Sequence, residues 1–390
     1  MGQLITRELR RLWQSPWQLA LVSYLPLLGT LALWWLFSAG LPRALPVAVV
    51  DQDQSQLSRM LVRQLSANSV ISPVSYQDIG QAQASMERAE AYAMVVLPFK
   101  LNQDLMIGHQ PSIDIRYNAQ FLLVGKLLSS QIQLSLADGL KQKARLKQLV
   151  SGVPPVQAEI NLNLIKTQSS ALYNANNNYV AFLVPPILIA LVQIVAMLVF
   201  ANALTEELRR ETLAEWFSLG TYRVLLSKVL VYTPLLMLQL GLVYAWLYGY
   251  LGLPMRGGLG QLLIAQLVML LAVWLIVLTI FALLQDSARV ISFCTALFAP
   301  SFAFMGVTFP THEMPLLAQW WRQIMPSSHY VNTHIGVIAY GQETQALVSQ
   351  LSSYWGFLLL LPVIALMLAK MRREQIGVQL GQTQITEGQG

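Results

Sequence analysis

Three of the four histidines lie in one segment, where their imidazoles could bind a metal or catalyse acid–base chemistry. His312 is followed by Glu313, and His329 and His334 come shortly after. A spacing of five residues does not place His329 and His334 on one helix face. No Asp or Cys in the segment completes the set of about four ligands that a structural zinc site needs. We therefore expect no metal site and assign these side chains to interfacial polar positions.

Two carboxylates could act as a pair, because Asp51 and Asp53 are two residues apart at the end of an apolar run. A turn that leads into the N-terminus of a helix accounts for both residues more simply. The sequence has neither the G-x-S-x-G pattern of a nucleophile elbow nor the H-E-x-x-H pattern of a zinc peptidase. We expect no catalytic residue in this chain.

The sequence also lacks a phosphate-binding loop, whose pattern is G-x-x-x-x-G-K-[ST]. Its single Gly-Lys pair is Gly125–Lys126. Gln120 stands where the first glycine is required, and Leu127 stands where the Ser or Thr is required. We expect no cofactor in this chain, so any ATP-driven work would depend on another subunit.

A short charged stretch, ELRRETLAEWFS at residues 207–218, stands between two very apolar segments. Helical periodicity predicts one amphipathic helix over residues 204–217, with apolar side chains on one arc and polar side chains, Glu207 among them, on the opposite arc. Glu206 and Arg210 form an i,i+4 pair in the favourable order. Two interpretations stay open: an interfacial helix that shields a loop, or a rigid lever whose polar face binds a soluble partner.

The composition places these elements in a membrane. The chain has 390 residues, of which 55% are hydrophobic and 11% are charged, whereas soluble globular proteins carry about 25% charged residues. Crossing a bilayer takes about 20 apolar helical residues. Six runs qualify, at 17–38, 179–203, 226–250, 261–284, 289–309 and 352–370. The predicted fold is an α-helical polytopic membrane protein with six transmembrane helices.

Lysine and arginine near the ends of these runs set the expected orientation. Arginines precede the first run, four basic residues lie between the second and third, and three follow the sixth. Both termini are therefore expected in the cytoplasm, residues 1–16 as an interfacial helix and residues 371–390 as a tail. Because the net charge of +6 arises largely from this topology, we expect no nucleic-acid partner.

The six runs are almost free of ionisable side chains. Ion-driven carriers keep such groups inside the membrane, so an ion-coupled mechanism is disfavoured. Gln193, Gln239 and Gln266 are neutral polar residues within the runs, and we expect them to form interhelical hydrogen bonds. The only cysteine, Cys294, excludes an intrachain disulfide and is expected to be a small buried residue.

Residues 41–178 are predicted to form an inserted α/β domain outside the membrane, between the first and second spans. Strands are expected in LPVAVVDQDQ, VISPVSY, AYAMVVLP and SIDIRYN, with helices over about 54–66 and 119–149 and a helix that Asp78 caps. Long loops cross membranes largely regardless of their charge. The remaining chain, 179–370, would carry spans two to six.

The segment 310–351 is too polar and too often interrupted by proline to span a membrane. It is expected on the outer side, as short helices that fold back against the outer leaflet. Trp320 and Trp321 suit the depth of the lipid headgroups.

Three segments resemble the membrane subunit of type-2 ABC exporters, a family with a large external domain between the first two spans. The charged stretch is similar to the family's R-E-x-G-T-L-E-x-L pattern, with Glu211 where the family has Gly. YNANNNYVAFLVPPILI is similar to the family's Y-N-P…F-x-x-P-G pattern, with Ala175 and Pro186 as departures. FMGVTFPTHEMPLLAQWWRQIMPSSHYVN is similar to S-G-x-x-x-P…M-P…P-x-x-Y, and its matching residues are Gly306, Pro310, Met314, Pro315, Pro326 and Tyr330.

This resemblance implies a permease that pairs with a second permease, identical or related, and with cytoplasmic ATPase subunits that bind ATP and Mg. We expect export of an amphiphilic or hydrophobic compound, or of a lipid-linked molecule, across the bacterial cytoplasmic (inner) membrane, because nearly uncharged spans suit such cargo. Membrane lipid and a periplasmic adaptor are expected as further partners. The expected ATPase-coupling residues are Glu207, Arg209, Arg210, Thr212, Leu213, Glu215 and Trp216. The alternatives are a membrane-anchored sensor or assembly scaffold that acts through its external domain, and a lipid-modifying enzyme that uses the three clustered histidines and Glu313.

Overall fold

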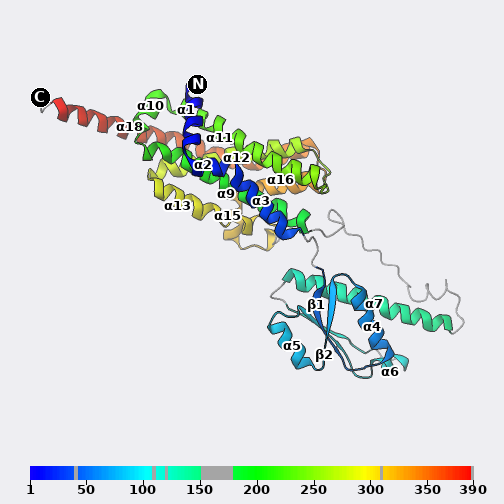
Figure 1. The fold of residues 1–390 in the computed structure, drawn as a ribbon. Coiled ribbons are helices and arrows are strands. Elements are labelled where there is room, and N and C mark those ends of the chain that lie inside the picture. Colours follow the sequence, from blue (N-terminus) through cyan, green and yellow to red (C-terminus); the bar gives the residue numbers. More distant parts are fainter. Residues whose placement is uncertain (39–42, 108–110, 119–121, 151–178, 308–310, 388–390) are drawn as a thin grey trace. The chain divides into compact units, whose positions relative to one another are not determined.

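The structure is a computed structural model that describes residues 1–38, 43–107, 111–118, 122–150, 179–307 and 311–387. It separates into two compact units (Figure 1). A sheet unit covers residues 39–170, and a helical unit combines residues 1–38 with residues 171–390. Each unit is described by itself.

The sheet unit contains four strands in the order β2-β1-β3-β4, with β4 antiparallel to β3 and the other pairs parallel. The strands are β1 (Leu45–Asp51), β2 (Ile71–Tyr76), β3 (Ala93–Leu97) and β4 (Asp114–Tyr117). The helices are α4 (Gln56–Ala67), α5 (Ile79–Glu87), α6 (Leu101–Met106) and α7 (Leu122–Val150). Each predicted strand and helix of this unit is confirmed, including the cap of α5, where Asp78 accepts a hydrogen bond from the Gln81 amide.

Side chains on β1 alternate between the two faces of the sheet, because successive residues of a strand point in opposite directions. Val47 and Val49 pack in the core beneath α4 and α7, whereas Ala48 and Val50 pack in a smaller core beneath α5. At the end of β1, Asp51 accepts hydrogen bonds from the two amides that follow in the turn. The Asp51 carboxylate therefore stabilises the turn, whereas the Asp53 carboxylate accepts from the Asn102 amide of α6 at 3.3 Å.

The helical unit is built from long apolar helices joined by short ones. Its first elements are α1 (Gly2–Gln14), α2 (Pro16–Val22), α3 (Tyr24–Phe37), α9 (Tyr179–Arg209), α10 (Leu213–Leu219), α11 (Thr221–Tyr244) and the π-helical η2 (Ala245–Tyr250). They are followed by α12 (Leu259–Leu284), α13 (Ser287–Phe298), α14 (Ser301–Phe304), the 3₁₀ turn η3 (Thr311–Glu313), α15 (Leu316–Ile324), α16 (Pro326–Ile338), α17 (Thr344–Leu351), the 3₁₀ helix η4 (Ser352–Leu359) and α18 (Leu360–Glu387).

Within the described residues, five helices are long and apolar enough to cross a membrane, and a bent pair, α2 with α3, would make a sixth. The pair bends by 47° at Ser23, just before Pro26, which has no N–H to donate to the Val22 carbonyl. Gln239 of α11 compensates at this bend, because its side-chain amide donates to the carbonyls of Leu21 and Ser23.

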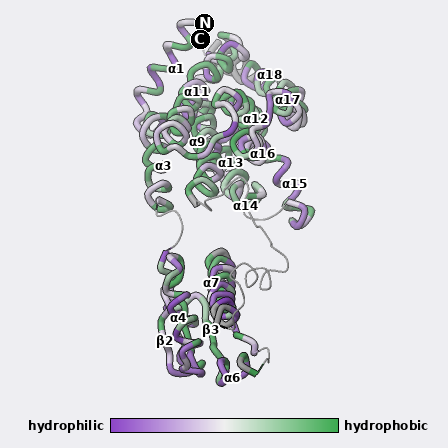
Figure 2. The backbone as a smooth tube through the Cα atoms, turned by 90° about the vertical axis from the view of Figure 1, so that its right-hand side faces the viewer, coloured by the Kyte–Doolittle hydropathy of each residue, from purple (hydrophilic) through white to green (hydrophobic). Residues whose placement is uncertain are grey.

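α9 and α12 form the buried centre of the helical unit. In α9, 72% of an apolar stretch of the helix is buried, and in α12 the share is 61%. Hydrophobic colouring is concentrated in this unit in Figure 2. Gln193 accepts from the Ser327 amide at 2.6 Å, and Gln266 donates to the Leu236 carbonyl at 3.2 Å. The predicted interhelical hydrogen bonds of the glutamines are confirmed, and Cys294 is buried as expected.

Candidate functional site

The charged stretch at 207–218 forms two helices, so the prediction of one continuous helix over 204–217 is wrong. α9 continues to Arg209, and α10 begins at Leu213. The first residues of the expected helix are therefore the end of the apolar helix α9. The amphipathic part is the seven-residue helix α10.

A helix cap between α9 and α10 explains the break. Glu211 has a φ of 55°, which is the left-handed conformation. Its amide donates to the Leu208 carbonyl at 3.2 Å, and the Thr212 amide donates to the Glu207 carbonyl at 3.0 Å. Bonds of these two spacings form a Schellman motif, in which the left-handed residue is usually glycine. Glu211 occupies that position and ends α9.

Apolar side chains hold α10 against the bundle. Leu213 and Trp216 are buried, and the Trp216 ring lies 5.7 Å from the Phe281 ring of α12. The Trp216 indole N–H donates to the Thr221 carbonyl at 3.2 Å. Leu213 and Trp216, two of the predicted ATPase-coupling residues, are covered by this chain itself and hold α10 in position.

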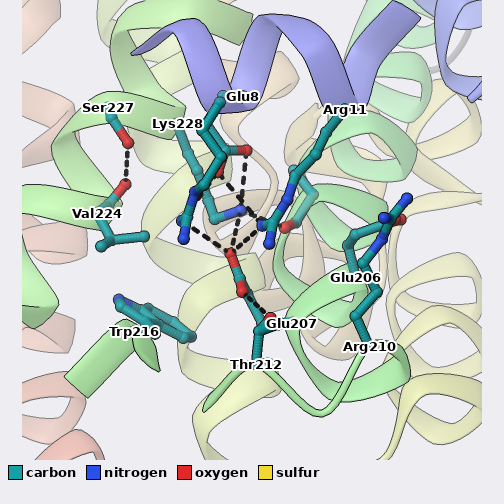
Figure 3. A network of polar contacts seen from close by, with 12 residues as sticks. Glu8, Arg11, Glu206, Glu207, Arg210, Thr212, Trp216, Val224, Ser227 and Lys228 are labelled. Atoms are coloured by element: carbon teal, nitrogen blue, oxygen red, sulfur yellow. Dashed lines mark hydrogen bonds and ion pairs between the residues drawn. The ribbon is translucent and has the colours of Figure 1, made fainter. Parts of the chain in front are cut away.

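The carboxylate of Glu207 is the centre of a buried network of charges (Figure 3). It is fully buried, and its Oε1 lies 2.6 Å from Arg11, 3.3 Å from Arg7 and 3.0 Å from Lys228. Its other oxygen accepts a hydrogen bond from the Thr212 hydroxyl. Glu207 was predicted to lie on a polar outer face. That prediction is wrong, because basic groups from α1 and α11 cover the side chain.

Glu8 of α1 is the second buried carboxylate of this network. Its oxygens lie 3.0 Å from Lys228, 3.2 Å from Arg7 and 3.5 Å from Arg11. Lys228 is fully buried and also donates to the Ala203 carbonyl at 2.8 Å. Buried charges persist when they are paired and hydrogen-bonded. Three helices that are distant in sequence, α1, α9 and α11, therefore meet at one set of ion pairs.

The ionisation of Arg11 follows from this environment. Burial disfavours the charged guanidinium, but the neighbouring carboxylate of Glu207 more than offsets that effect, so the pKa of Arg11 is raised. The side chain stays positively charged at any physiological pH. Its contact with Glu207 is a permanent feature of the folded chain.

One side of α10 and the preceding turn stays exposed. Glu215 contacts Arg7 at 3.3 Å and is 52% exposed, which links the surface to the buried charges. Arg209 and Arg210 are each 44% exposed, and both pair with Glu206. The accessible part of the predicted coupling set is thus Arg209, Arg210 and Glu215.

The sequence analysis missed Arg7, Glu8, Arg11 and Lys228 as members of this site. The one signal that could have indicated them is an acidic residue, Glu8, between arginines, together with Lys228 inside an otherwise apolar helix. The seven predicted coupling residues do lie together, although in three roles: Thr212 and Glu207 in the buried network, Leu213 and Trp216 in the core, and the remainder at the surface.

The expected outer segment is a series of short helices, as predicted, and its residues have structural roles. The Tyr330 hydroxyl lies within hydrogen-bonding distance of the Tyr244 hydroxyl and of the Leu262 carbonyl. Pro326 begins α16, and its carbonyl accepts from Tyr354. Gly306 has a φ of 87°. Met314 and Pro315 lie between η3 and α15, and Pro310 lies outside the described residues.

The histidines occupy separate environments. His329 contacts Ser353 and the Gln323 carbonyl, His334 contacts Tyr248 at 2.9 Å, and His312 lies at the surface beside Glu313. Among the residues that the structure describes, no group of three or more His, Cys, Asp or Glu side chains could hold a metal ion.

A comparison with protein families matches residues 16–369 to the model described as ABC-2 family transporter protein. A search of curated proteins found no match to the chain. The family match confirms the resemblance carried by the three sequence segments, and it implies a partner subunit that binds ATP. With its long apolar helices, this multi-pass membrane protein belongs to the ABC-2 family of transporter permeases.

Proposed function

We propose that this chain is the permease subunit of an ABC exporter that moves an amphiphilic or hydrophobic compound outward across the bacterial cytoplasmic membrane. A separate subunit would bind ATP and Mg and hydrolyse the ATP. The observation that carries the proposal is the position of α10, whose exposed Glu215 pairs with Arg7 of α1. The end of α9, just before α10, is tied to α1 and α11 through the buried ion pairs of Glu207.

The network of buried ion pairs around Glu207 is suited to transmitting force between helices. Breaking a buried ion pair by removing one partner costs about 3–5 kcal/mol. α1, α10 and the start of α11 would therefore move as one body when an ATPase presses on Arg209, Arg210 and Glu215. Displacement of α11 and α9 would then change the packing of the spans.

The predicted spans carry almost no ionisable groups, which suits an amphiphilic cargo, because a charged cargo would need charged partners inside the membrane. Both termini would be cytoplasmic, on the side of α10, and the sheet unit would lie outside. A second permease, identical or related, would complete the pathway. An adaptor outside the membrane would receive the cargo.

The test is copurification of an ATPase in a gentle detergent. The Arg209→Glu, Arg210→Glu double variant reverses two exposed charges without altering the buried carboxylates. The Arg372→Glu, Arg373→Glu variant is a matched control, because those arginines are also adjacent, exposed and on a helix near a predicted cytoplasmic end.

We expect an ATPase, identified by mass spectrometry, to copurify with the parent and with the control, and to be lost from the variant at 209 and 210. Equal capture by all three proteins would show that this edge does not bind the ATPase. Failure to capture an ATPase with the parent chain would contradict the exporter function.

A further inference from the structure

A groove of about 410 Å³ lies in the helical unit, between α12, α13, α15 and the 3₁₀ helix η4. Its volume is within the range of about 300–1,000 Å³ that small-molecule sites occupy. The residues of η4 and α18 that line it are Ser353, Gly356, Phe357 and Leu360. Their spacing of three and four residues places them on one side of the helix.

One part of the groove is polar. There the imidazole of His329 forms hydrogen bonds with two of the residues that line the groove. His329 Nε2 lies 2.9 Å from the Gln323 carbonyl oxygen, and His329 Nδ1 lies 2.9 Å from the Ser353 hydroxyl. The carbonyl can only accept, so Nε2 carries the proton. Burial lowers the pKa of His329, so the ring is neutral and Nδ1 accepts.

This tautomer of His329 determines which group donates in its hydrogen bond with Ser353. The Ser353 hydroxyl must donate its proton to His329 Nδ1, which leaves the lone pairs of the oxygen for a donor in the groove. Gln323 lines the same groove, and its side-chain amide can act as both a donor and an acceptor. The polar part therefore matches an uncharged group that can donate and accept hydrogen bonds.

The rest of the groove is apolar. α12 contributes Ile276 and Ile280, α13 contributes Phe293 and Leu297, and the lining includes no ionisable residue among those that the structure describes. Phe293 is 55% exposed, so the groove is open at the surface of the unit. A charged head would lose its water here without gaining an opposite charge, so its binding is disfavoured.

We propose that this groove binds the transported amphiphile, and that this amphiphile has an alkyl chain and an uncharged hydroxyl- or amide-bearing head. The head binds Ser353 and Gln323, and the alkyl chain packs along α12 and α13. The assignment of the occupant as cargo rests on the proposed export function, whereas the binding itself does not.

Gly356 allows a direct test. A Cβ added at this residue meets no heavy atom within 4 Å, so Gly356→Leu introduces an apolar side chain at the lining of the groove without a clash at its first carbon atom. Gly260 of α12 is a matched control, because a Cβ there also meets nothing within 4 Å and the residue does not line the groove.

The probe is a diazirine-bearing hexadecanol, added to the purified full-length permease and located by mass spectrometry after irradiation. We expect labelled peptides from residues 353–360 or 293–297 in the parent and in Gly260→Leu. Labelling should fall at least tenfold in Gly356→Leu. Equal labelling of Gly356→Leu, or equal labelling of the parent by a diazirine-bearing phosphatidylcholine, would overturn the site as one for an uncharged head.

A second pair of variants tests the polar end. Ser353→Ala should weaken labelling, and Ser353→Thr, which retains the hydroxyl, should restore it. In a complex with the ATPase, Mg-ATP should reduce labelling if the occupant is cargo; unchanged labelling identifies a resident lipid and overturns the cargo assignment. Labelling without ATPase capture would leave the groove intact and contradict only the export function.

Discussion

At the scale of single residues, Glu211 has a backbone conformation that suits glycine. Its φ of 55° costs a residue with a Cβ atom roughly 1 kcal/mol relative to glycine. We predict that Glu211→Gly raises the free energy of unfolding by about 1 kcal/mol. Glu211→Ala retains the Cβ atom and should give no comparable gain. Unfolding in detergent, followed by circular dichroism, measures both, and equal effects of the two changes would contradict the strain.

Lys228 is the residue whose loss should harm the buried network most, because it contacts both Glu8 and Glu207 at 3.0 Å and is fully buried. We predict that Lys228→Met lowers the free energy of unfolding by about 3–5 kcal/mol, since two buried carboxylates lose a counter-charge. Lys370→Met should change stability by less than about 0.5 kcal/mol, because its pair with Glu374 is exposed. A small effect of Lys228→Met would show that Arg7 and Arg11 are sufficient counter-charges for Glu8 and Glu207.

At the scale of elements, Gly306 connects α14 to η3 through a conformation that excludes a side chain. It has a φ of 87°, and an added Cβ would lie 2.5 Å from the Thr311 methyl group. We predict that Gly306→Ala destabilises the chain by roughly 1–3 kcal/mol. Adding Thr311→Ser, which removes that methyl group, should restore part of the loss. Thermal unfolding of the single and double variants tests this. If the double variant recovers no stability, contact with the Thr311 methyl group is not the cause of the loss.

Periodicity was sufficient to predict the strands and helices of the sheet unit. It failed at 204–217 because a helix end depends on local capping, and the usual signal for the cap, a glycine, is absent where Glu211 stands. The 3₁₀ form of η4 was not predicted either. Its hydrogen-bond pattern differs from that of an α-helix by one residue, which a hydropathy pattern does not record.

The sequence predicted where the candidate site lies in the chain. It did not predict which of the side chains in the site are exposed. A helical wheel assigns charged residues to the outer face, and Glu207 was assigned there. Whether such a residue is exposed depends on its neighbours in space, and those of Glu207 are Arg7 and Arg11, about 200 residues earlier in the chain. No local pattern around Glu207 contains this information.

At the scale of the whole molecule, the lone buried Cys294 makes the proposed topology accessible to labelling. Cys294→Ala gives a background without cysteine, into which Arg88→Cys or Arg209→Cys can be introduced at exposed positions. In spheroplasts, an impermeant maleimide should label the Arg88→Cys variant directly. It should label the Arg209→Cys variant only after permeabilisation. The reverse pattern would invert the proposed orientation.

The sharing of one carboxylate oxygen by Arg7, Arg11 and Lys228 constrains how this protein can evolve. A substitution at any one of these positions changes the charge balance for all the others, so its effect depends on the residues already present there. We expect relatives to vary at these positions as correlated sets. A reversal of sign at Glu207 would have to be preceded by neutral replacements on α1 or α11, in a restricted order.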